Sequence, residues 1–161
     1  MHIANALSPA HSCVVVDSII LLNEALSPNG GQAPLVNRLL TDAQIGFSEQ
    51  TFAELKSLLW KPKFDRYITM ERRHRLLHDC NAVALWVDVS AQIASVRYSR
   101  DVTDDAFIRA ALAAGALLLV TDGDDLLCFD PIANVELRIV TPRRASIETY
   151  QVFIIPAKAR S

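Results

Sequence analysis

The chain has 161 residues and 51% of them are hydrophobic, so it has the length of one domain and the apolar content for a substantial core. Its formal net charge of −2 at pH 7 excludes the class of strongly basic nucleic-acid binders. The three cysteines, Cys13, Cys80 and Cys128, are far apart and form no CxxC pair, so neither a zinc ribbon nor a disulfide framework is indicated.

The N-terminal segment does not have the pattern of a targeting signal. The opening residues MHIANALSPAHS lack the basic start and long apolar centre of a signal peptide, and no apolar run reaches membrane-spanning length. We therefore expect a cytoplasmic protein with reduced thiols and no membrane association. We expect residues 1–11 to form a flexible tail, residues 12–150 one domain, and residues 151–161 a C-terminal tail.

The first predicted strand is CVVV, over residues 13–16. A run that is apolar on both faces is typical of a central strand in a parallel sheet. Asp17 follows it directly, at the strand end where open α/β sheets place their ligands. Residues 19–26 then predict a buried helix, which the sequence SPNGG at 27–31 ends.

The next segment predicts a helix, a strand and a second helix. Residues 34–40 begin with proline, which suits the first turn of a helix, and residues 44–47 read as a short strand. Ser48 is the predicted N-cap of a helix over residues 49–60. Glu54 lies at the edge of the apolar face of that helix, so its carboxylate is able to point into a cleft.

The middle of the chain is harder to interpret. Residues 69–85 predict another helix, with its charges concentrated in the first half, and residues 86–89 predict a strand. The stretch from there to Arg100 fits no single element.

The stretch from Asp101 to Asp125 organises the second half of the chain. Asp101 or Thr103 is able to cap a helix, and Asp104 and Asp105 then lie in its first turn, where the helix dipole favours acids. Apolar residues three and seven positions after Asp105 place it on the buried face at the mouth of the helix.

Two further strands complete the predicted sheet. Residues 117–121 form an apolar run followed by Asp122, and residues 137–140 form a last strand before a helix over 142–150. The alternation of strands and helices predicts an α/β fold whose parallel strands are joined by right-handed crossovers.

Four carboxylates are predicted to meet at one edge of this sheet. Asp17 and Asp122 follow apolar strands, and Glu54 and Asp105 lie on helices near the same edge. Clustered carboxylates repel one another unless a cation lies among them, and oxygen ligands without His or Cys favour Mg²⁺ or Mn²⁺. We therefore predict a divalent-metal site that cleaves phosphodiesters.

Each of these acids also has an ordinary structural explanation. Asp17 would open a turn, Glu54 would face solvent on a helix, Asp105 would complement a helix dipole, and Asp122 would lie in a turn. Their convergence on one sheet edge favours the metal site over four separate explanations.

The chain resembles the PIN domain family, and most of all its VapC-like branch of toxin components from toxin–antitoxin systems. The resemblance rests on four segments in order, VVVDSIILLNEALSPNG, SEQTFAELKSLLWKPKF, RDVTDDAFIRAALAAGALLLVTDGDDLL and LRIVTPRRASIE, which cover roughly residues 13–150. It implies a three-layer α/β/α fold around a central parallel sheet of about five strands. It also implies metal-dependent cleavage of single-stranded RNA.

The resemblance also assigns residues to the site. The first acid of the family corresponds to Asp17, the second to Glu54, and the third to Asp105 with Asp104 beside it. With Asp122 completing the shell, these five residues would hold Mg²⁺ or Mn²⁺, and attack by water would leave a 5′-phosphate and a 3′-hydroxyl.

Two positions depart from the family pattern. Ile19 stands where an asparagine is usual, and Gly123 stands where the last acid is usual, so Asp122, or Asp124 after a shift of the loop, would replace that acid. The first hypothesis is an endoribonuclease toxin with single-stranded RNA, a cognate antitoxin and a second copy of the chain as partners. The alternative is a catalytically impaired PIN-like module that binds RNA or a protein.

A third hypothesis is a phosphotransfer domain on a similar sheet. A dehalogenase-type phosphatase would have a second aspartate two residues after Asp17, where this chain has Ile19. We rank this hypothesis below the other two.

Overall fold

The computed structural model describes residues 13–130, 132 and 135–149, and within them the chain forms a five-stranded sheet in which every pairing is parallel. The strand order is β3-β2-β1-β4-β5. The strands are β1 (Cys13–Val16), β2 (Gln44–Phe47), β3 (Ala84–Trp86), β4 (Leu118–Val120) and β5 (Arg138–Val140). The tails predicted at 1–11 and 151–161 lie outside the described residues.

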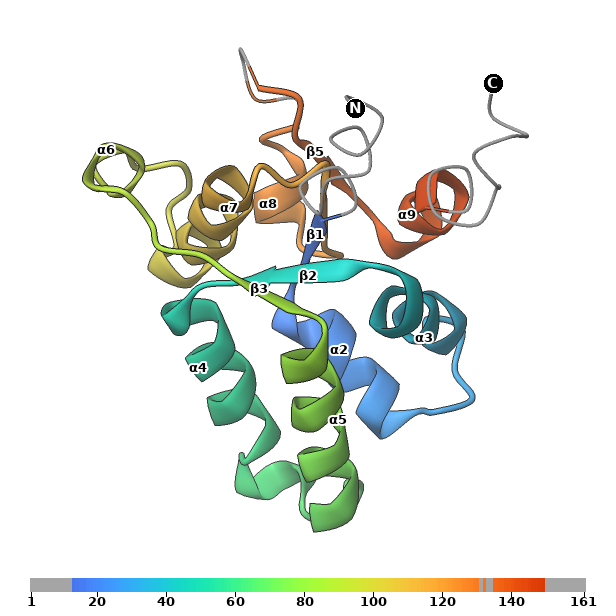
Figure 1. The fold of residues 1–161 in the computed structure, drawn as a ribbon. Coiled ribbons are helices and arrows are strands. Elements are labelled where there is room, and N and C mark those ends of the chain that lie inside the picture. The colour runs from blue at the N-terminus through green and yellow to red at the C-terminus, as the bar shows by residue number, and fades with distance from the viewer. Residues whose placement is uncertain (1–12, 131, 133–134, 150–161) are drawn as a thin grey trace, which may run out of the picture.

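Helices cover both faces of the sheet, as Figure 1 shows. The helical segments are α2 (Ser18–Leu26), α3 (Ala33–Asp42), α4 (Glu49–Leu59), η2 (Pro62–Phe64), α5 (Met70–Ala82), α6 (Ala91–Ala94), α7 (Val102–Ala114), α8 (Asp124–Leu127) and α9 (Pro142–Thr149). One face packs against α2, α3, α4 and α5, and the other against α7 and α8. The predicted three-layer α/β/α fold is confirmed.

The central strand β1 explains why its sequence is continuously apolar. It pairs with β2 on one side and with β4 on the other, and its four residues are at most 1% exposed. Val14 and Val16 face the helices of one layer, whereas Cys13 and Val15 face those of the other. A strand with helices on both faces requires apolar side chains at every position.

Local capping explains where the helices beside the site begin. Ser48 accepts the amide of Thr51 at 3.1 Å and its own amide donates to Thr51 Oγ1 at 3.0 Å, so the predicted N-cap of α4 is confirmed. Asp101, rather than Thr103, caps α7, because its carboxylate accepts the amide of Thr103 at 2.8 Å. Gly115, with φ of +60°, ends that helix in the left-handed conformation.

The prediction for residues 69–89 was wrong at its boundary. Helix α5 ends at Ala82, and the strand occupies Ala84–Trp86 instead of residues 86–89. Ala84 and Leu85 are good helix formers, but here they pair with β2 at the edge of the sheet. Tertiary pairing therefore overrides local propensity, and α6 lies within the stretch whose structure the sequence left open.

The strand order creates a switch point between β1 and β4. The chain builds outward from β1 through β2 and β3, then crosses back to add β4 and β5 on the other side. The crevice at the carboxyl ends of β1 and β4 is where open α/β sheets bind their ligands. No helix in the described part of the chain is long and apolar enough to span a bilayer.

Candidate functional site

Asp17 lies at this switch point and is held from three sides. Its amide donates to Val120 at 2.9 Å, which fixes the backbone beside the end of β4. Its Oδ1 accepts the amide of Ile19 at 3.3 Å and so caps α2, and its Oδ2 accepts the hydroxyl of Thr121 at 2.8 Å. The carboxylate therefore has a fixed position between two strand ends.

The surroundings of Asp17 disfavour its negative charge. Burial raises the pKa of its carboxyl, the hydrogen bond from Thr121 opposes this rise, and the negative charge of Asp122 adds to it. Among the described residues no ion pair is formed by this half-buried carboxylate, which makes it a suitable ligand for a metal ion.

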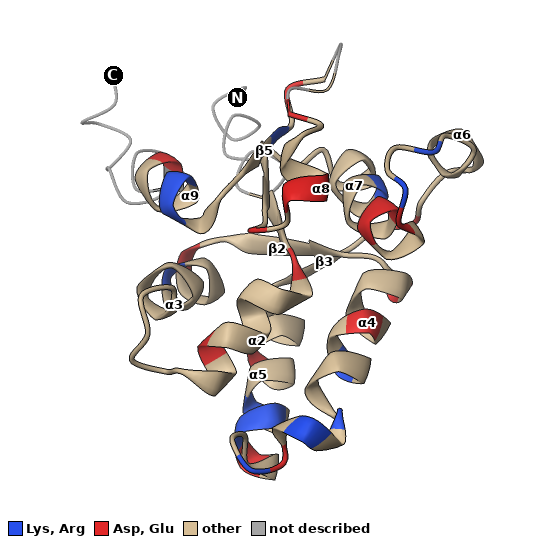
Figure 2. Cartoon of the chain, turned by 180° about the vertical axis from the view of Figure 1, so that it is seen from behind, with Lys and Arg blue, Asp and Glu red and all other residues tan. Residues whose placement is uncertain are grey.

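Asp104, in the first turn of α7, belongs to the same electrostatic cluster. Burial raises the pKa of Asp104 to about 6, together with repulsion from Asp101, Asp17 and Asp125, in that order, and from Asp105. Figure 2 shows the acidic first turn of α7 and the acidic start of α8 near the acidic end of β1. Acids from three elements therefore converge on the switch point.

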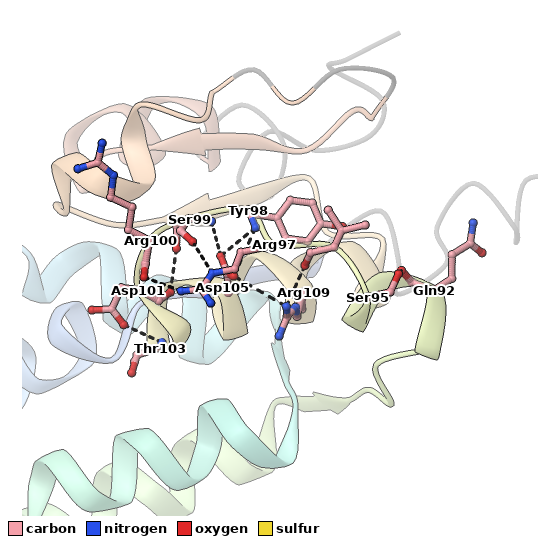
Figure 3. A network of polar contacts seen from close by, with 11 residues as sticks. Gln92, Ser95, Arg97, Tyr98, Ser99, Arg100, Asp101, Thr103, Asp105 and Arg109 are labelled. Atoms are coloured by element: carbon pink, nitrogen blue, oxygen red, sulfur yellow. Dashed lines mark hydrogen bonds and ion pairs between the residues drawn. The ribbon is translucent and has the colours of Figure 1, made fainter.

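Asp105, the next residue, has different neighbours. It is 1% exposed, and its carboxylate accepts the backbone amides of Tyr98, at 3.2 Å, and Ser99 (Figure 3). Arg109 lies 3.8 Å from Asp105 Oδ2 and donates to the carbonyl of Val96 at 2.8 Å. The predicted burial of Asp105 is confirmed, and its carboxylate fixes the loop over residues 96–101 that precedes α7.

The acids that follow β4 act on two different neighbours. Asp122 is exposed and close enough to Asp17 to affect its pKa, and its Oδ2 accepts Nε2 of Gln32 at 2.9 Å. Asp125 lies instead on α8 and acts on Asp104. The predicted site omits Asp125, because only the short helix α8, which the sequence does not signal clearly, brings it toward α7.

Glu54 lies on α4 and is partly buried. Helix α4 packs against α2, which Asp17 caps, and against α7, which carries Asp104. Within the described residues the carboxylate of Glu54 forms no hydrogen bond or ion pair. Its metal-binding role stays a prediction.

The donor chemistry of this site fits a hard divalent cation. No group of three or more His, Cys, Asp or Glu side chains in the described part of the chain is placed to hold a metal ion. Mg²⁺, however, is commonly bound through one or two carboxylates, with water and substrate phosphate filling its other positions. The mutual repulsion of Asp17 and Asp104 is the feature that such a cation would relieve.

Comparisons with known proteins give one family and one fold. The model of the PIN domain matches residues 13–124. A chain in the crystal structure of VapBC2 from Rickettsia felis bound to a DNA fragment from their promoter is similar in fold, with a TM-score of 0.50 and 17% sequence identity. The match covers 79% of this chain and 98% of that chain. No curated protein matches in sequence.

Proposed function

The chain belongs to the PIN domain family, and from this premise we propose that it is a metal-dependent endoribonuclease that hydrolyses single-stranded RNA. The observation that carries the proposal is the convergence of Asp17 and Asp104 at the switch point of the sheet, with the pKa of both carboxyls raised. Repelling carboxylates at a ligand-binding edge are characteristic of functional sites.

We assign the cation to Asp17 and Asp104, with Asp122 and Asp125 as the adjacent acids. A bound Mg²⁺ or Mn²⁺ would supply Lewis-acid polarisation of the scissile phosphate and would offset the charge that develops on it. Thr121 orients the Asp17 carboxylate through its hydrogen bond. Asp105 contributes from the protein interior, because it holds the loop that precedes Asp101 and Asp104.

The biological setting is part of the same proposal. A toxin of a type II toxin–antitoxin system would act in the cytoplasm and would be held inactive by a cognate antitoxin protein. We also expect a second copy of the chain as a partner. Its interface would not use Ile20, Leu21 and Ala25 of α2, because these side chains are buried in the core. Light scattering of the purified chain tests the homodimer, and a monomer at high concentration would contradict it.

A second candidate function is a PIN-like module that binds RNA or a protein without cutting. Two observations favour it. Gly123 stands where the family has an acid, and no cluster of three acids is placed for a metal within the described residues. This module would share the fold and the switch-point acids but would bind the cation too weakly for catalysis.

Cleavage of a mixed-sequence single-stranded RNA separates the two functions. We expect the wild-type chain to cut it in Mg²⁺ or Mn²⁺ but not in EDTA, and Asp17→Asn to lose the activity. Asp42→Asn is the matched control, because Asp42 is an exposed acid at the end of α3 and should leave cleavage unchanged. If wild type and Asp17→Asn leave the RNA equally intact in both metals, the impaired module is the better description.

A further inference from the structure

A pocket lies beside the acidic site, between the start of α3 and α9. Its volume is about 480 Å³, within the range of pockets that bind small organic ligands. Asp122 forms part of its wall next to the switch point, Leu35 and Ile147 supply apolar surface, and Arg143 supplies a cation. Helices α3 and α9 pack against each other and lie side by side in both views of the chain (Figures 1 and 2).

Gln32 connects this pocket to a second one of about 470 Å³. Its Nε2 donates to Asp122 at 2.9 Å, and its Oε1 accepts Nδ2 of Asn23 at 3.4 Å on the side of the second pocket. Gly31 and Gln32 line both pockets, so the two are parts of one surface that passes the edge of the acidic site. The carboxamides of Gln32 and Asn23 provide both donors and acceptors along it.

Arg143 is the cation that this surface offers to a ligand. Its side chain is exposed and forms no ion pair with any described residue. Its neighbour Arg144 is instead engaged with Glu148 at 2.9 Å on the same helix. Two adjacent arginines on α9 therefore differ in what they contact, and only Arg143 lines the pocket.

We propose that this pocket binds the nucleotide of a single-stranded RNA that neighbours the scissile phosphate. Arg143 would bind a phosphate through its planar guanidinium, and Gln32 would contact a base edge. Ile147, which is 51% exposed, would pack against the base. This inference rests on the proposed function, because it requires that an RNA strand bound at Asp17 continues into the adjoining pocket.

RNA fits this surface better than a protein segment does. The pocket adjoins the acids at which we propose phosphodiester cleavage, so a strand that leaves the site passes over it. Unstacked bases of single-stranded RNA are commonly recognised by stacking and by hydrogen bonds to their edges, and this surface offers an apolar wall, carboxamides and a guanidinium. An acidic protein segment would need the cation but neither the carboxamides nor the apolar wall.

The test measures binding rather than cleavage, so that its failure is distinct from failure of the proposed function. A fluorescein-labelled single-stranded RNA of mixed sequence is titrated against the full chain carrying Asp17→Asn, with Mg²⁺ and with EDTA. Arg143→Ala and Arg144→Ala are then compared in that background at several salt concentrations. The two substitutions remove the same charge from the same helix. Only Arg143 lines the pocket, and Arg144→Ala also removes the ion pair with Glu148.

We expect Arg143→Ala to weaken binding about fivefold and to lower the salt slope by about 0.7, the contribution of one phosphate contact to a single strand. Arg144→Ala should stay within about twofold of the parent, as expected for an exposed side chain outside the interface. Equal effects of the two substitutions, or no RNA binding by the parent, would overturn the inference. So would displacement of the RNA by poly-glutamate at matched charge, which would identify a site for acidic protein segments.

Discussion

Thr121 Oγ1 donates a hydrogen bond of 2.8 Å to Asp17 Oδ2, and this contact joins the ends of β1 and β4 across 104 residues of sequence. Thr121 is fully buried, and the same oxygen accepts the amide of Gly123 at 3.0 Å. One hydroxyl thus fixes both the first acid of the site and the start of the loop that follows β4. A buried residue that follows β4 therefore acts on the site.

Replacing this hydroxyl tests the relationship. Thr121→Val keeps the shape of the side chain but is expected to lower the free energy of unfolding by about 2 kcal/mol, because one hydrogen bond to a carboxylate and one from the amide of Gly123 are lost. It should also raise the pKa of Asp17 further and weaken Mg²⁺ binding, as seen by urea unfolding and calorimetric titration. Thr121→Ser is the control, and equal values for the two variants would contradict the role of the hydroxyl.

The raised pKa of Asp104 predicts how metal-free stability depends on pH. Because its folded pKa of about 6 exceeds the ordinary 3.8, the folded chain binds this proton more tightly than the unfolded chain does. The contribution of Asp104 to stability therefore falls as pH rises from about 4 to about 6 and stays low above that. Solvent screening limits the loss to about 1 kcal/mol.

Asp104→Asn should remove this penalty. We expect the variant to melt about 2–4 °C above wild type at pH 7.5 in EDTA, as about 1 kcal/mol predicts for a chain of this size, and to match wild type near pH 3.5. Added Mg²⁺ should stabilise wild type more than Asp104→Asn. Asp42→Asn is the control for loss of a remote charge, and a pH-independent difference for Asp104→Asn would contradict the prediction.

Asp105→Asn is expected to act in the opposite direction from Asp104→Asn. It weakens two backbone contacts and leaves Arg109 without its acid, which should cost about 3 kcal/mol, the range for breaking a buried ion pair. Hydrogen exchange should accelerate at the amides of Tyr98 and Ser99, which donate to Asp105 in the wild type. If the two asparagine variants changed stability in the same direction, the separate roles of the neighbouring acids would be disproved.

The sequence predicts the architecture well because periodicity and caps are local signals. The buried run CVVV, the N-cap Ser48 and the N-cap Asp101 each correspond to the structure. The order of alternating elements is enough to infer parallel pairing. The edge strand at Ala84–Trp86 escapes this reasoning, because its partner β2 determines its conformation.

The site is only partly predictable for a physical reason. Helical periodicity correctly places Asp105 on the buried face, but a buried face holds either a ligand set or a structural anchor, and only the contacts with Tyr98 and Ser99 distinguish them. Asp104, one position earlier, lies about 100° around the helix, and the negative charge of Asp17 contributes to its raised pKa. The sequence marks both acids, and the resemblance assigns the third acid of the family to Asp105 with Asp104 beside it.

Gly123→Asp tests whether the departure from the family pattern limits the site. Gly123 has φ of −75°, and an added Cβ would meet Thr121 Oγ1 at 3.4 Å, an ordinary contact, so the position accepts a side chain. It is also the N-cap of α8 without a capping side chain, where aspartate is favoured. A carboxylate here would join Asp17 and Asp104 as a further oxygen ligand.

We expect Gly123→Asp to tighten Mg²⁺ binding about tenfold, because added ligand charge raises affinity for a hard cation, and to accelerate RNA cleavage. In EDTA the same variant should lose stability, since the new charge repels Asp17. Gly123→Asn is the matched control, because it caps α8 with the same shape but adds no charge. Equal Mg²⁺ affinity and cleavage for the Asp and Asn variants would show that the missing acid does not limit the site.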